Sequence, residues 1–195
     1  MCSSDLDANV MASPRLSKKF VVVGDQLGNL NAYDVRNGKR QWSYNTAGAI
    51  YSNAAINRER IVVGSADGYI HCIDLNSGNG IWKIQTSASV LGSALIKGDT
   101  VFIGGSAGEI YALRLSDGSR IWTYQGLEGP VVSTPVITQG KLILGAWDRH
   151  LYALDTRTGS LIWKWNNGTS VRNYSPASCI PVIRDRKSTR LNSSH

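Results

Sequence analysis

A repeat of about 40 residues constrains the fold of this chain more than any other feature of its sequence. Four tryptophans lie 40, 40 and 41 residues apart, and they are Trp42, Trp82, Trp122 and Trp163. A glycine stands four residues before each of them, and these are Gly38, Gly78, Gly118 and Gly159. Because the same pattern returns at four successive positions, the chain is built from repeated units.

Each unit has the pattern of several short β-strands. A run of three apolar residues, as at 61–63, is too short for a helix and apolar on both faces, which indicates a buried strand. A second strand pattern, as at 70–74, lies between two glycine-containing turns. Four strands in about 40 residues are typical of one blade of a β-propeller. The repeating Trp is never followed by Asp, which disfavours a WD40 repeat.

The end of each unit resembles a known family. Residues 153–163 read Ala-Leu-Asp-Thr-Arg-Thr-Gly-Ser-Leu-Ile-Trp, which resembles the tryptophan-docking motif Ala-x-Asp-x-x-Thr-Gly-x-x-x-Trp of pyrroloquinoline-quinone (PQQ) β-propeller repeats. The first unit differs from this motif at Asn37, and the third has Arg114 for Asp and Asp117 for Thr. The resemblance extends over about residues 9–184.

The resemblance implies an all-β fold, a partial β-propeller of about four four-stranded antiparallel blades plus one strand of a fifth. The implied blades are 9–45, 50–87, 90–127 and 131–168, with a fifth beginning at 172–184. In this family each motif Trp packs between neighbouring blades, which implies structural roles for the four tryptophans and for the glycines before them. The same structural role is implied for the other motif residues Ala32, Ala112, Ala153, Asp34, Asp74 and Asp155.

The two ends of the chain depart from the repeat. Residues 1–6 and 186–195 have no counterpart in any unit and resemble translated sequencing-adaptor sequence. We therefore expect residues 7–185 to be a piece of a larger propeller, whose missing blades are needed to close the ring. A signal sequence is not evident in this piece.

Composition and charge exclude several classes of protein. The 21 basic and 14 acidic residues give a net charge of +7, but the basic residues are scattered through predicted turns, where solvated charges are the ordinary case. We therefore expect no nucleic-acid partner, and without a run of 18 apolar residues we expect no membrane span. The cysteines Cys2, Cys72 and Cys179 lack the spacing of a metal site or a disulfide framework.

Two classes of function fit the resemblance. One is a non-catalytic scaffold for protein interaction or ligand sensing, with a protein partner or a fused domain, outside the cytoplasm of a bacterium, similar to an outer-membrane assembly propeller lipoprotein. The alternative is a fragment of a PQQ-dependent quinoprotein dehydrogenase, which would use PQQ with calcium. Calcium needs several oxygen ligands together, and Glu59, Glu109 and Glu128 form no such cluster in the sequence. We therefore expect no catalytic residue, cofactor or metal in this segment.

One predicted hairpin breaks the repeat. Arg149 replaces a glycine that the other units carry, in the sequence Trp147-Asp148-Arg149-His150. Trp and Arg are common anchors of interfaces, so Trp147, Asp148 and Arg149 are candidate contacts for a ligand or partner. The alternative is a bulkier loop in which Asp148 and Arg149 pair. His71 lacks the neighbours that a catalytic site requires and is expected to pack between blades.

Overall fold

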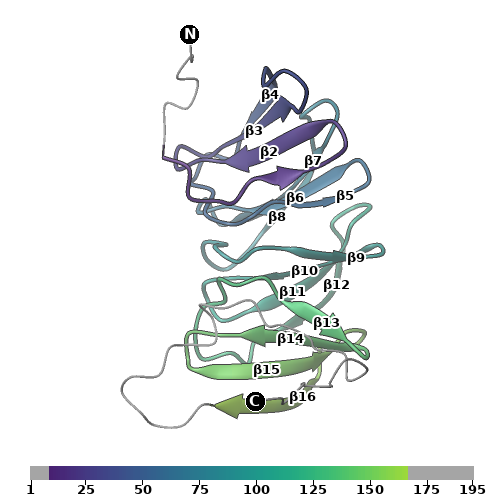
Figure 1. The fold of residues 1–195 in the computed structure, drawn as a ribbon. Helices are drawn as coiled ribbons and strands as arrows, with labels where there is room; N and C mark the ends of the chain where they lie inside the picture. Colours follow the sequence, from purple (N-terminus) through teal and green to yellow (C-terminus); the bar gives the residue numbers. More distant parts are fainter. Residues whose placement is uncertain (1–8, 167–195) are drawn as a thin grey trace, which may run out of the picture.

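The computed structural model describes residues 9–166, which form sixteen strands in four sheets (Figure 1). Blade 1 holds β1 (Arg15–Leu16), β2 (Phe20–Gly24), β3 (Asn29–Asp34) and β4 (Arg40–Asn45). Blade 2 holds β5 (Ala55–Asn57), β6 (Arg60–Gly64), β7 (Tyr69–Asp74) and β8 (Gly80–Gln85). Blade 3 holds β9 (Leu95–Lys97), β10 (Thr100–Gly104), β11 (Ile110–Arg114) and β12 (Arg120–Tyr124). Blade 4 holds β13 (Val136–Thr138), β14 (Lys141–Gly145), β15 (His150–Asp155) and β16 (Leu161–Asn166).

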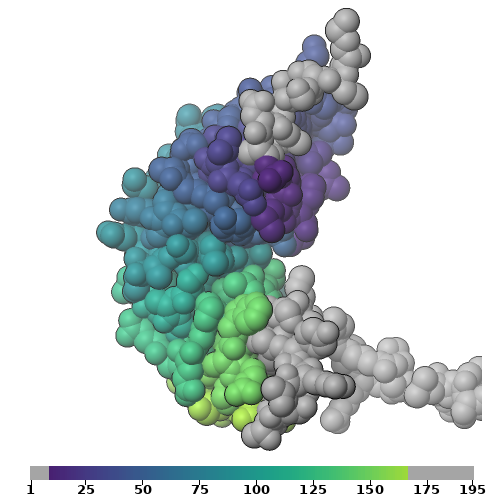
Figure 2. Space-filling model, turned by 90° about the vertical axis from the view of Figure 1, so that its left-hand side faces the viewer, coloured from purple at the N-terminus to yellow at the C-terminus, as the bar shows by residue number. Residues whose placement is uncertain are grey.

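Within each blade the strands pair antiparallel in the order of the sequence. The blades follow one another along a curved arc that leaves the ring open (Figure 2). The predicted all-β partial propeller with four-stranded antiparallel blades is thus confirmed. The predictions for the two adaptor-like ends and for a fifth blade at 172–184 lie outside the described residues.

The two middle strands of each blade form the core. Ile61, Val62 and Val63 of β6 are fully buried, since neighbouring blades cover both faces of the sheet. The outer strand β8 instead alternates between exposed and half-buried residues. A register shift between Cys72 and Ile73 forms a bulge, and a bulge recurs at the same place in each of the four described blades.

The order of the strands divides the ends of the blades into two faces. One face, which we call the AB/CD face, carries the turns between the first and second and between the third and fourth strands of every blade. The opposite face carries the turns between the second and third strands and the connections to the next blade. The first strands β5 and β9 of neighbouring blades lie side by side, which places the first strands at the concave edge of the arc.

Candidate functional site

The repeating tryptophans lie at the boundaries between blades. The indole Nε1 of Trp82 donates a hydrogen bond of 3.0 Å to the carbonyl oxygen of Leu115 in the next blade. Its ring packs so closely on Gly118 that a Cβ there would lie 2.8 Å from the ring. Trp42 contacts Leu75 and Gly78 in the same way, and Trp122 contacts Thr156 and Gly159. The glycines therefore leave room for an indole as well as forming the turn.

The other motif residues support the same boundary. Ala32, Ala112 and Ala153 are fully buried and pair directly opposite the Trp of the neighbouring strand. The carboxylates of Asp34, Asp74 and Asp155 accept hydrogen bonds from backbone amides of the turns that follow them. At the two ends of the arc, no further blade of the described residues covers these motif residues. Trp163 is therefore 39% exposed, and a Cβ at Gly38 would meet no described atom within 4 Å.

A carboxylate on the opposite face of each blade bonds to a polar side chain of the third strand. The four pairs are Asp25 with Asn31, Asp67 with His71, Glu109 with Tyr111, and Asp148 with Tyr152. Three of the pairs also form a hydrogen bond with an earlier segment of the chain. The Tyr44 hydroxyl bonds to His71, the Ser87 hydroxyl donates to Glu109, and the amide of Glu128 donates to Asp148. Glu109 and Asp148 thus tie blades 3 and 4 to the chain that precedes them, and His71 does the same for blade 2.

His71 lies inside one of these pairs and is 3% exposed. Its Nε2 lies 3.0 Å from Asp67 Oδ2, and its Nδ1 lies 3.1 Å from the Tyr44 hydroxyl of blade 1. Burial lowers the pKa of His71 below its ordinary value, although the charge of Asp67 opposes this shift and Lys83 adds to it. The neutral imidazole is therefore the native form, in agreement with an expected packing role.

The stability of the fold should fall on mild acidification because of His71. The unfolded chain takes up a proton on this imidazole below about pH 6.5 and the folded chain does not, so stability is complete above that pH and falls below it. We expect His71→Asn, which copies Asn31 of blade 1, to flatten the dependence of stability on pH below about pH 6.5, where the slope per proton is at most about 1.4 kcal/mol per pH unit. Urea unfolding at a series of pH values measures it, and equal slopes in the two proteins would contradict the assignment.

The hairpin at 147–150 separates the three predicted contact residues. Asp148 turns inward, where it accepts hydrogen bonds from the Tyr152 hydroxyl at 2.5 Å and from the amides of Glu128 and His150. The alternative pairing of Asp148 with Arg149 is not found, because the carboxylate is already engaged by these groups. Trp147 is 53% exposed and Arg149 is exposed with a φ of 69°, so these two side chains face solvent at the tip of the hairpin.

Charge is unevenly divided between the two faces. In residues 9–166, twelve cations border the turns of the AB/CD face, and they are Lys18, Lys19, Arg36, Lys39, Arg40, Arg58, Arg60, Lys97, Arg114, Arg120, Lys141 and Arg157. Six acids share that face, and they are Asp34, Glu59, Asp74, Asp99, Asp117 and Asp155. Within the described residues, the turns and connections of the opposite face hold the five acids Asp25, Asp67, Glu109, Glu128 and Asp148, with Arg149 as a cation. The sequence alone did not reveal this division, since it depends on which turns share a face.

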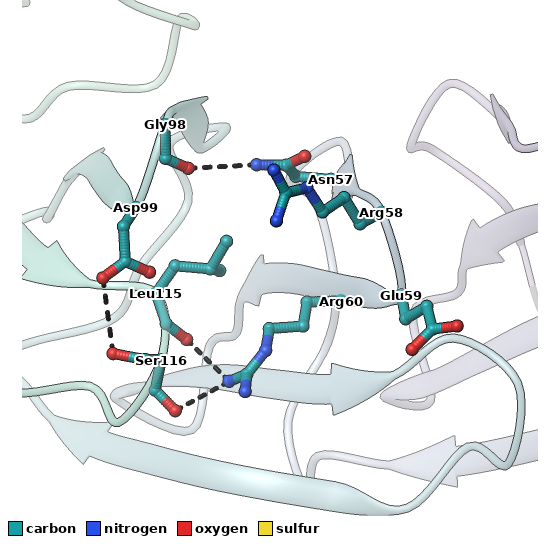
Figure 3. A pocket seen from close by; sticks show the side chains of 8 residues that line it. All are labelled: Asn57, Arg58, Glu59, Arg60, Gly98, Asp99, Leu115 and Ser116. Atoms are coloured by element: carbon teal, nitrogen blue, oxygen red, sulfur yellow. Dashed lines mark hydrogen bonds between the residues drawn. The ribbon is translucent and has the colours of Figure 1, made fainter.

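Two grooves open on the AB/CD face between neighbouring blades. The groove between blades 2 and 3 has a volume of about 590 Å³ (Figure 3). Arg60 lies at its floor and donates through Nη1 to the carbonyl oxygens of Leu115 at 2.8 Å and Ser116 at 2.7 Å. Asn57 donates across it to the carbonyl oxygen of Gly98 at 3.1 Å. The groove is thus a fixed feature of the boundary between the two blades.

The groove between blades 1 and 2 has a volume of about 480 Å³ and is more apolar. Phe20, Ile56 and Leu75 form its apolar lining, while Lys18, Lys19 and Arg58 are cations of its rim. Arg58 and Glu59, the tip of the β5–β6 hairpin, line both grooves and so separate them.

A third cavity, of about 290 Å³, lies along the first strands at the concave edge. It is lined by alanine, leucine and isoleucine side chains from β5, β9 and their approaches, together with Arg15, Leu16 and Thr134. Among the residues that the structure describes, no carboxylate lines this cavity and no three His, Cys, Asp or Glu side chains gather as a metal site would need. This donor set does not fit calcium, which takes six to eight oxygen ligands.

Comparisons with known proteins identify relatives of this fold. A family model described as outer membrane protein assembly factor BamB matches residues 3–124 and 66–186. The crystal structure of BamB from Moraxella catarrhalis is 26% identical with a TM-score of 0.73, covering 82% of this chain and 50% of that one. The chain therefore spans half the length of that BamB. A search of curated proteins gave no match.

Two further structures share the fold with different roles. Quinohemoprotein alcohol dehydrogenase ADHIIG from Pseudomonas putida HK5 is 17% identical with a TM-score of 0.73, covering 89% of this chain and 35% of that one. A chain of the mitotic checkpoint complex is 20% identical with a TM-score of 0.74, covering 85% of this chain and 53% of that one. At these identities the likeness shows the fold alone. Within residues 9–166 no helix is long and apolar enough to cross a membrane.

Proposed function

Since this chain belongs to the PQQ-like β-propeller family described as outer membrane protein assembly factor BamB, we propose that it is a non-catalytic scaffold for protein interaction or ligand sensing. The family match, which extends over most of the chain, is the observation that carries the proposal. The carboxylates of Asp25, Asp67, Glu109 and Asp148 agree with it, because all four are engaged in hydrogen bonds within the fold.

The location and the partner belong to the same proposal. The family is described as an assembly factor for outer membrane proteins, so we place this propeller outside the cytoplasm of a bacterium, as part of a larger assembly. The partner is another protein or a fused domain. Trp147 and Arg149 are proposed contacts because they project from the tip of one hairpin, whereas Asp148 serves to hold that hairpin in place.

A quinoprotein dehydrogenase is the weaker alternative. The likeness to the alcohol dehydrogenase, at 17% identity, supports the fold and no more. PQQ with calcium would need oxygen ligands at the centre of the propeller, and the described part of the concave edge offers apolar side chains instead. We therefore propose no cofactor for these four blades.

Titration with PQQ in the presence of calcium tests this choice. The full chain, followed by absorbance and by calorimetry, should give no saturable change, and it should oxidise no alcohol with an artificial electron acceptor. A second arm places a photo-crosslinking residue at exposed Trp147 in bacterial cells and, as a control, at Lys83, an exposed residue of the outer strand β8. Saturable PQQ binding, or adducts of equal yield at both positions, would overturn the proposal.

A further inference from the structure

The AB/CD face combines an excess of positive charge with two grooves, and its central residue is Arg58. Arg58 lines both grooves, is exposed, and makes no side-chain hydrogen bond or ion pair with any residue in 9–166. Figure 3 shows its side chain at the groove between blades 2 and 3, with Glu59 directed away from it. The guanidinium is therefore free to bind a negatively charged group.

The backbone at Arg58 indicates that this arginine is costly for the fold. Its φ is 55°, in the left-handed region that favours glycine, and the corresponding turn of blade 3 has Gly98 with a φ of 62°. A glycine would fit this turn without strain. A charged side chain held in a sparsely populated conformation, beside two grooves, points to a role outside folding.

The surroundings of Arg58 define what could bind. Arg60 is held by two carbonyl oxygens and so keeps its positive charge at the groove floor, with no carboxylate bonded to it in the described residues. Asp99 on the far wall is occupied by Ser116 at 3.4 Å and Arg114 at 3.9 Å. On the other side of Arg58, Lys18 and Lys19 border a groove floored by apolar side chains.

We propose that the AB/CD face binds an extended acidic segment of a protein partner. The carboxylates of this segment bind Arg58 and the cations beside it, and one apolar side chain of the segment enters the groove between blades 1 and 2. This inference rests on the scaffold function and adds the surface and the chemistry of the partner. Guanidinium and carboxylate form paired, charge-assisted hydrogen bonds. A bilayer would meet only the protruding turns, whereas Phe20 and Leu75 at the groove floor are 9% and 6% exposed and are reached by a side chain.

The chain offers a matched pair of variants for the test. Arg58→Gly removes one exposed guanidinium from a left-handed turn position of the AB/CD face. Lys83→Ser removes one exposed cation from the outer strand β8, away from both grooves. Glycine relieves backbone strain at position 58, and position 83 is an exposed strand position, so both variants should stay folded. A difference in binding between them then reports the face and not the fold.

The probe is a fluorescein-labelled peptide in which Glu and Leu alternate, with the corresponding Lys and Leu peptide as its control. Fluorescence anisotropy with the full chain should show binding of the acidic peptide and not of the basic one. Salt should weaken this binding, because ~0.1 M salt screens charges that are more than about 10 Å apart. Arg58→Gly should raise the dissociation constant about tenfold, the effect expected for loss of one charge-assisted contact, and Lys83→Ser should leave it unchanged.

Several outcomes would overturn the proposal. Equal binding by the two variants would remove the role of Arg58, and binding to phosphatidylglycerol vesicles without binding to the peptide would assign the face to a membrane. If Arg58→Gly were unfolded, Lys18→Ser and Lys19→Ser, on the other wall, would carry the same test. If the unchanged protein bound neither the acidic peptide nor PQQ, this inference alone would be overturned. Saturable binding of PQQ would instead overturn the scaffold function.

Discussion

Trp122→Ala should lower the free energy of unfolding by about 3–5 kcal/mol, the range for replacing a buried large aromatic side chain by alanine. Trp122 is 8% exposed, packs against Phe102 with ring centroids 5.8 Å apart, and lies on Gly159 of the next blade. The change also removes the hydrogen bond from Nε1 to the carbonyl oxygen of Thr156, at 3.1 Å. The measurement is chemical denaturation of the full chain, followed by circular dichroism.

Trp147→Ala is the control for this prediction. Trp147 is 53% exposed at a hairpin tip, and surface replacements of this kind change stability by about 0.5 kcal/mol or less. Losses of equal size in the two variants would show that the docking role has been assigned to the wrong tryptophan. A loss confined to Trp122→Ala would support docking as the source of stability.

The periodic part of the fold was predictable from the sequence because it depends on local pattern. The spacing of the tryptophans and the apolar runs predicted four four-stranded antiparallel blades, and the strands found include β6 at Arg60–Gly64 and β7 at Tyr69–Asp74. Each blade repeats the same short-range contacts, so a repeat in sequence becomes a repeat in space.

The binding face was not predictable in the same way. The cations were interpreted as scattered and solvated, which describes exposed Arg58 but not Arg60, because Arg60 is held by two carbonyl oxygens. Their gathering on one face follows from strand order, because turns that alternate along the chain fall on alternate ends of the blade. The signal that could have revealed it is the placement of cations such as Lys18, Arg58 and Lys97 at or just after the end of the first strand of successive units.

The glycines that end the second strand of blades 1 to 3 have a packing role that the turn pattern did not indicate. The sequence pattern placed glycine-containing turns on both sides of the third strand, and in blade 1 the turn before that strand contains Gly24 and Gly28. Gly28 does have a φ of 84°, but Gly24 lies in a tight contact instead: a Cβ there would come within 2.4 Å of Ile50 Cγ2. Gly64 and Gly104 meet Val90 and Val131 in the same way. Packing between a strand and a distant connection cannot be read from the hairpin alone.

Gly24→Ala should therefore destabilise the chain by about 1–3 kcal/mol, the cost of overpacking a filled core. The new methyl group would compete for space with Ile50, which is fully buried. Gly105→Ala is the matched control, since a Cβ there would lie 3.6 Å from its nearest atom, which is ordinary contact. Thermal and urea unfolding of both variants give the comparison.

The cause can be isolated by changing Ile50 as well. Ile50→Ala removes the Cγ2 atom that the added methyl group would meet, and the nearest remaining atom of the side chain, Cβ, lies 2.8 Å away. The cost of Gly24→Ala should therefore be smaller in the Ile50→Ala protein than in the unchanged one, with a coupling of about 0.5–3 kcal/mol between the two sites. Strictly additive losses would mean that Gly24 is needed for its backbone and not for the space it leaves. A coupling of the expected sign would make size matching between strand ends and inter-blade connections a second device, beside the tryptophans, that holds consecutive blades together.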